Sequence, residues 1–202
     1  MNNILQLSLA ALLLFFTACA NDTYEGEERD MDTGTITTTT SGSSSGQGYA
    51  MSDRFLDQLD DFNEEYLNLA DDLVDSDFED AAEEVQRMKG EWSSIDVGET
   101  AERGKAYWMQ QSPKWEAALN RMAAATDIES LRIGFSELTN AMTETYRRIG
   151  VPDDQLYLIY CPMAFDDKGA YWLSKNRKVR NPYFGDKMLE CGSVQETLTE
   201  AN

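Results

Sequence analysis

The sequence reads FLDQLDDFNEEYLNLADDL over residues 55–73, and its apolar side chains recur at alternating steps of four and three residues. Asp and Glu fill most of the intervening positions. Because a helix turns once in about 3.6 residues, this spacing gathers the apolar side chains on one face. It predicts an amphipathic helix over about residues 52–74, with Ser52 placed to cap the first turn. The core face consists of Phe55, Leu59, Phe62, Tyr66, Leu69 and Leu73.

The same periodicity recurs three times farther along the chain. It predicts helices over about residues 77–95, 102–125 and 128–149. Ser76 and Glu79 have the spacing of a capping box at the start of the second helix. Short connections after the first and third helices require their neighbours to run antiparallel. The predicted fold class is all-α: an up-and-down four-helix bundle with an irregular C-terminal segment that contains Cys and Met.

The helical period ends after Pro152, and residues 156–194 have a different composition. Glycine and proline recur there at intervals that favour turns, which argues against a fifth long helix. Together with the helices, this segment is expected to form one folded domain over residues 51–202. The turn-forming residues are Gly169, Pro182, Gly185 and Gly192.

The charge balance excludes several classes of function. The chain has 37 acidic and 17 basic side chains and no histidine, which gives a formal net charge of −20. A nucleic-acid partner is excluded, because binding to phosphates requires a cationic surface. The missing histidine excludes Ser/His/Asp and Cys/His catalysis and metal sites built on imidazole. No nucleophile–base pair can be singled out, so we expect a protein that is not an enzyme.

Residues 1–18 have the composition of a signal peptide, with an uncharged apolar run too short to span a bilayer. Small residues precede Cys19, and this arrangement resembles the lipobox of bacterial lipoproteins, in which the cysteine is lipidated. The alternative is an ordinary secretory signal cut near Ala18 or Ala20. Residues 19–50 are acidic and then rich in Thr, Ser and Gly, which predicts a disordered tether. The protein is therefore expected in the bacterial cell envelope, anchored to the outer membrane and facing the periplasm or the cell surface.

Acidic residues are concentrated between Asp53 and Glu84, where fourteen Asp or Glu are opposed by Arg54 alone. Most of them lie off the apolar stripe, so this region is expected to be a solvated face. A surface for a divalent cation or a partner is the second interpretation.

Two cysteines other than Cys19 lie in the C-terminal segment, and each has a methionine nearby. The pattern is Cys161-x-Met163 at one end and Met188-x-x-Cys191 at the other. Thiolate and thioether are soft ligands that select Cu(I) and its congener Ag(I) over hard ions. One hypothesis is therefore a soft-metal site formed by these four residues.

A structural disulfide between Cys161 and Cys191 is the competing interpretation. Disulfides persist in exported proteins, and setting aside a lipidated Cys19 leaves an even number of cysteines. Met163 and Met188 would then belong to the core. The spacing alone leaves both interpretations open.

The C-terminal segment also resembles a known family. Four motifs carry the resemblance: Cys-Pro-Met-Ala at 161–164, Lys-Gly-Ala-Tyr-Trp-Leu-Ser at 168–174, Asn-Pro-Tyr-Phe-Gly at 181–185 and Met-Leu-Glu-Cys-Gly at 188–192. They are similar to the signature of a bacterial exported domain of unassigned function. That domain also occurs fused to periplasmic adaptor subunits of copper/silver RND efflux systems. The resemblance implies an envelope role in heavy-metal handling and an envelope or efflux protein as partner.

Two functions follow from these patterns. The first is a membrane-anchored envelope lipoprotein that binds Cu(I) or Ag(I) through Cys161, Met163, Met188 and Cys191. The alternative is a non-catalytic interaction or structural lipoprotein domain with a Cys161–Cys191 disulfide and no metal. In both cases the basic side chains of the C-terminal segment are expected to dock on the acidic face of the bundle, and the oligomeric state stays open. The basic side chains are Lys168, Lys175, Arg177, Lys178, Arg180 and Lys187.

Overall fold

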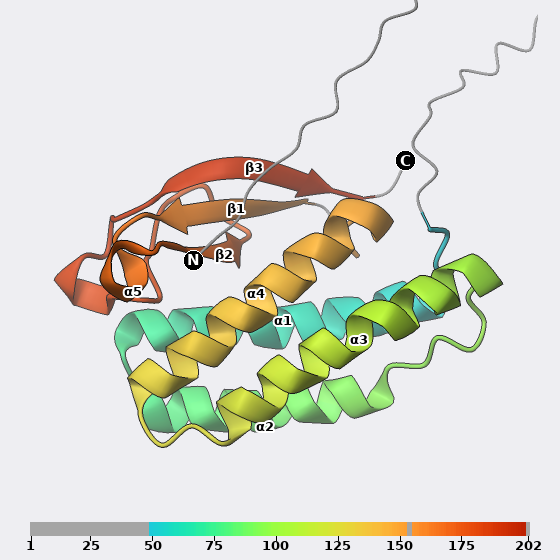
Figure 1. Cartoon of the computed structure of the whole chain (residues 1–202), viewed down its shortest axis with the longest axis horizontal. Coiled ribbons are helices and arrows are strands. Elements are labelled where there is room, and N and C mark those ends of the chain that lie inside the picture. Colours follow the sequence, from blue (N-terminus) through green and yellow to red (C-terminus); the bar gives the residue numbers. More distant parts are fainter. Residues whose placement is uncertain (1–48, 153–154, 201–202) are drawn as a thin grey trace, which may run out of the picture. The chain divides into compact units, whose positions relative to one another are not determined.

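The computed structural model describes residues 49–152 and 155–200. The expected signal peptide, Cys19 and nearly all of the expected tether lie outside these ranges. Within them, four long helices form the core and begin and end within about two residues of the predicted positions (Figure 1). They are α1 (Asp53–Asp75), α2 (Phe78–Ser94), α3 (Glu102–Ala123) and α4 (Ile128–Ile149). No helix of the described ranges has both the length and the hydropathy needed to cross a bilayer.

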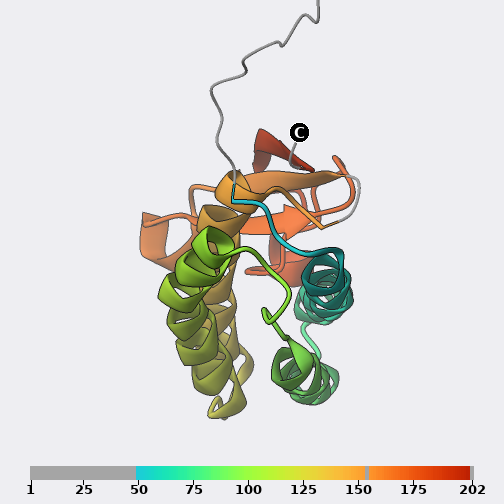
Figure 2. The same cartoon turned by 90° about the vertical axis from the view of Figure 1, so that its right-hand side faces the viewer.

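The four helices form two antiparallel hairpins, α1 with α2 and α3 with α4 (Figure 2). Aromatic side chains fill the space between the hairpins. The Trp115 ring lies 5.4 Å from both the Phe62 ring of α1 and the Trp108 ring of α3, measured between centroids. Trp92 of α2 joins them at 5.6 Å from Trp108. The predicted apolar face of α1 is fully buried in this core.

The expectation of a purely all-α fold is wrong, because the C-terminal segment forms a three-stranded antiparallel sheet (Figure 1). Its strand order is β2-β1-β3. The run Leu-Tyr-Leu-Ile-Tyr at 156–160 is rich in residues that favour strands, and it occupies the central strand. Glycine and proline mark the connections, as expected, but the segments between them are extended. The strands are β1 (Gln155–Cys161), β2 (Ala170–Ser174) and β3 (Ser193–Thr199), with the short helices α5 (Ala164–Asp167) and η1 (Gly185–Lys187) between them.

The predicted capping box at Ser76 is also wrong. Ser76 ends α1 in a left-handed conformation with φ of 59°. Asp77 caps α2 instead, and its carboxylate accepts the backbone N–H groups of Glu79 and Asp80 at 3.0 and 3.1 Å. The physical reason is that α1 continues to Asp75, so the connection is only two residues long and the cap moves one position along the chain.

The sheet lies over α1 and α4 (Figure 1). Tyr66 of α1 connects it to both helices. The buried Tyr66 hydroxyl accepts the backbone N–H of Leu173 at 3.1 Å and lies 2.7 Å from Oγ1 of Thr139. Leu173 belongs to the edge strand β2, and the Tyr183 hydroxyl donates to the neighbouring carbonyl of Tyr171. Two tyrosine hydroxyls therefore cover the outer edge of β2, where unpaired backbone groups would otherwise be left.

We expect Tyr66→Phe to lower the free energy of unfolding by about 1–3 kcal/mol, because the buried N–H of Leu173 loses its acceptor. Tyr146→Phe is the matched control. Tyr146 is equally buried, but its hydroxyl has no hydrogen-bond partner among the residues described. This variant should not be destabilised. Urea unfolding followed by circular dichroism measures both, and equal losses in the two variants would contradict this account of the sheet contact.

Candidate functional site

The four sulfur-bearing residues of the predicted site lie near one end of the sheet. Cys161 ends β1 and is fully buried, and it forms a disulfide with the half-buried Cys191, which lies two residues before β3. Their Cα atoms are 5.7 Å apart. Met163 follows Cys161 at the surface, with 47% of its area exposed. Met188 follows η1, and its carbonyl accepts the N–H of Cys191 at 3.0 Å.

The disulfide interpretation predicts that Met163 and Met188 belong to the core. Met188 is half-buried, which partly agrees. Met163 is exposed, so this part of the disulfide interpretation is wrong. The residue directly after it, Ala164, is the one that fills the buried position.

Asn181 holds the loop that carries Cys191. The side chain is completely buried, and its Nδ2 donates to the carbonyl of Cys191 at 2.7 Å. Its Oδ1 accepts the N–H of Tyr183 at 2.8 Å, and its own N–H donates to Leu189 at 2.9 Å. The Asn-Pro-Tyr motif is therefore explained by structure: an asparagine satisfies buried backbone groups on both sides of the loop.

A strained turn follows Met163. Phe165, Asp166 and Asp167 have φ values of 52°, 56° and 63° in succession. Residues with a side chain rarely adopt this left-handed conformation in a row. Gly169 then has φ of 78°, and a Cβ there would collide with the Tyr160 ring, so glycine is required at this position. The Lys-Gly-Ala motif thus reflects a close approach of backbone to an aromatic ring.

Arg132 is a buried residue that sequence reasoning missed. It lies on α4 with 4% of its area exposed. Its Nη2 donates to the carbonyl of Leu73 at 3.0 Å and to Oγ of Ser76 at 3.1 Å, and its Nε donates to the carbonyl of Pro182 at 2.8 Å. Glu129 balances the charge at 2.8 Å. An arginine between apolar positions of a helix looks solvent-exposed in the sequence, and no local pattern identifies its partners.

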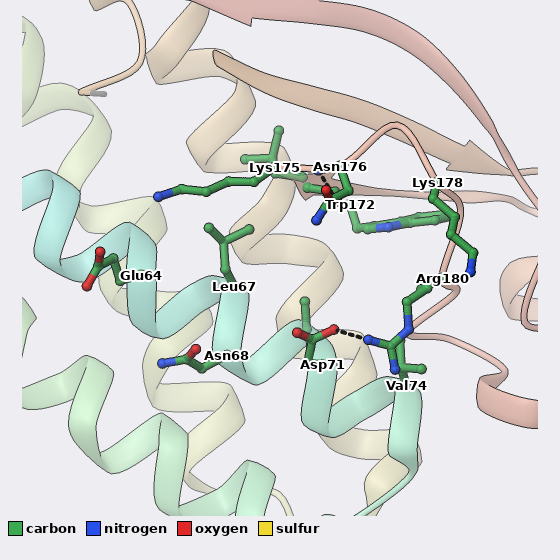
Figure 3. Close-up of a pocket in the computed structure, with 13 residues that line it drawn as sticks. Glu64, Leu67, Asn68, Asp71, Val74, Trp172, Lys175, Asn176, Lys178 and Arg180 are labelled. Atoms are coloured by element: carbon green, nitrogen blue, oxygen red, sulfur yellow. Dashed lines mark hydrogen bonds and ion pairs between the residues drawn. The ribbon is translucent and has the colours of Figure 1, made fainter. Parts of the chain in front are cut away.

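The basic C-terminal segment docks on the acidic face of α1, as expected, through Arg180. Its guanidinium contacts Asp71 at 2.9 Å (Figure 3). It also lies 3.4 Å from Asp75. Lys175 and Lys178 belong to the same segment, but neither has an ion-pair partner within the described part of the chain. The expected docking is thus confirmed for Arg180, and the other five basic side chains predicted to dock form no ion pair within the described ranges.

The acidic face is mostly solvated, with one exception between α1 and α2. Glu84 is buried, and desolvation raises its pKa from 4.5 to about 7, helped by the nearby Glu65 and opposed by Arg87. Burial likewise raises the pKa of Asp72 to about 6, with Asp80 adding to the effect. These shifts arise from helix packing, and no group of three or more His, Cys, Asp or Glu side chains in the described ranges is arranged to hold a metal ion.

Residues 63–154 match the model of a family described as "Protein of unknown function (DUF3347)". The match covers somewhat less than half of the chain, from the middle of α1 to the residue before β1. It supports the expectation of a domain of unknown function. No curated protein and no solved structure matches the chain.

The matched range and the C-terminal signature lie side by side in the sequence. The family model covers most of the helical bundle, whereas the motifs that carry the resemblance lie in the sheet and its connections. Tyr66 and Arg132 join the two regions, so a single folded unit contains both. Export and a link to efflux adaptors stay predictions.

Glu84 makes stability depend on pH. An acid whose pKa is higher in the folded protein than in the unfolded chain destabilises the fold as it ionises. The stability that the fold gains from a protonated Glu84 is therefore complete below about pH 4.5, and it is lost as the pH rises through about 7. We therefore expect the melting temperature to fall between about pH 5 and pH 7.5, and Glu84→Gln to raise it at the higher pH.

Glu116→Gln is the control for this prediction, because Glu116 is exposed on α3 and its substitution removes the same charge. Self-repulsion within a chain of net charge −20 also weakens the fold as the pH rises. Only Glu84→Gln should flatten the dependence strongly. Scanning calorimetry measures the melting temperature of both variants across this pH range. If both variants flatten the pH dependence to a similar degree, the dependence comes from general charge repulsion, and a specific role of Glu84 is contradicted.

Proposed function

We propose that this chain is a lipid-anchored protein of the bacterial cell envelope whose folded domain is a non-catalytic binding module. Cys19 carries the lipid, residues 19–50 act as the tether, and residues 51–202 are the domain that meets a partner. The outer membrane, with the domain facing the periplasm or the surface, is the proposed location.

The disulfide is the observation that carries this proposal. Cys161 and Cys191 close a loop of 30 residues, and a link of this length contributes roughly 3–4 kcal/mol on the chain-entropy model. Such a bond is typical of exported proteins. It also occupies both thiols that could act as ligands or nucleophiles, which favours a structural role for the segment that carries the signature.

A soft-metal role for Cu(I) or Ag(I) is the second candidate, favoured by the exposed Met163 beside Cys161 and by Met188 in contact with Cys191. The donor set does not fit the metal while the disulfide is closed, because the ligand chemistry requires thiolates. It fits in the reduced protein, where Cys161 and Cys191 would supply thiolates and the methionines thioethers.

Intact-mass spectrometry of the protein isolated from the cell envelope without reductant tests the proposal. We expect an acylated N-terminal Cys19, a mass lower by two hydrogens than that of the dithiol, and no uptake of added Cu(I). An unmodified N-terminus would overturn the anchor. Two free thiols would overturn the disulfide-stabilised module, and uptake of one Cu(I) by the reduced protein, lost in Cys161→Ser/Cys191→Ser, would establish the second candidate.

A further inference from the structure

A groove of about 540 Å³ runs between α1 and residues 172–180, the segment that begins in β2 (Figure 3). Its size lies within the range of roughly 300–1,000 Å³ that is usual for ligand sites. Apolar residues from both walls line it; Trp172 and Leu173 are buried beneath it, and Leu67 of α1 is the half-buried apolar side chain that points into it (Figure 3). Leu67 is half-buried on a helix whose other outward positions are mostly acidic, so this face of α1 has an apolar centre.

The charges around the groove differ from those of the rest of the molecule. Near one end of the groove, the Arg180 guanidinium forms an ion pair with Asp71, which neutralises its charge (Figure 3). Lys175 and Lys178 stand on the same wall, exposed, and have no ion-pair partner among the residues described. A chain of net charge −20 therefore presents two unpaired ammonium groups on one wall of the groove, whereas Glu64 of α1 places an exposed carboxylate on the other. Such an arrangement favours anionic groups attached to an apolar one.

The groove also has polar groups suited to a peptide backbone. Asn68 lines it from α1 and Asn176 from the opposite segment (Figure 3). Each amide can donate and accept hydrogen bonds, as the C=O and N–H groups of an extended chain require. Between Glu64 and Val74 the helix rises about 15 Å, which accommodates about four or five extended residues.

We propose that this groove binds a short extended segment of a partner protein in which an apolar side chain is flanked by acidic ones. The apolar side chain packs on Leu67, and the carboxylates meet Lys175 and Lys178. This inference rests on the proposed function of the domain as a binding module and names the chemistry of its partner.

The test is isothermal titration calorimetry of the full chain with the peptide acetyl-Ser-Glu-Leu-Glu-Ser-amide. We expect saturable binding, at least fivefold weaker in Lys175→Glu/Lys178→Glu. Lys168→Glu/Lys187→Glu is the matched control, because it changes the net charge equally at exposed lysines outside the groove. Its affinity should stay within twofold of the unmodified chain. Leu67→Ser should weaken binding, as should replacement of the peptide's leucine by serine.

Three results would overturn the proposal. They are the absence of binding at millimolar peptide, an equal loss of affinity in the two lysine variants, and binding of decanoate but not of the peptide, which would assign the groove to an anionic amphiphile. These results are separate from the test of the proposed function. If the protein is lipidated and disulfide-bonded but does not bind the peptide, the proposed function as an envelope module is retained and only this assignment of its partner is rejected.

Discussion

A buried guanidinium connects the parts of this fold. Arg132 of α4 donates hydrogen bonds to the carbonyl of Leu73 in the last turn of α1 and to the carbonyl of Pro182 in the C-terminal segment. A buried charge is tolerated only where its hydrogen bonds are made, so the three elements must keep this arrangement together. Tyr66 makes a second connection of the same kind, from α1 to Thr139 of α4 and to Leu173 of β2. The position of the sheet on the bundle therefore depends on polar groups satisfied deep in the structure.

These connections give the C-terminal signature a structural meaning. Asn181 satisfies the backbone of the loop that carries Cys191, and Gly169 permits the approach of the backbone to Tyr160. The disulfide fixes the same loop to the end of β1. Motifs that look like a ligand site in the sequence thus contribute to packing as well. The surface that we propose for binding lies elsewhere, in the groove between α1 and the wall that carries Lys175 and Lys178.

The helices could be predicted well because each has a periodic apolar face that packing then buries, as for Phe55 to Leu73 in α1. The sheet could not, because its central strand is buried along most of its length and lacks the alternation that reveals a strand with one wet face. The spacing of Cys161 and Cys191 allowed either a disulfide or a soft-metal site, so the sequence could not decide that they are paired. Arg132 and Tyr66 act through partners 50 to 107 residues away, and no local spacing reports such contacts.

Hydrogen exchange of the native protein tests the central claim, that sheet and bundle form one cooperative unit. The amide of Leu173 should exchange with the same free energy of opening as the amides of Phe62 in α1 and Leu138 in α4, because all three should be exposed only by global unfolding. Exchange of Leu173 through a smaller opening that leaves Phe62 and Leu138 protected would contradict it, and would make the sheet a separate, loosely attached element.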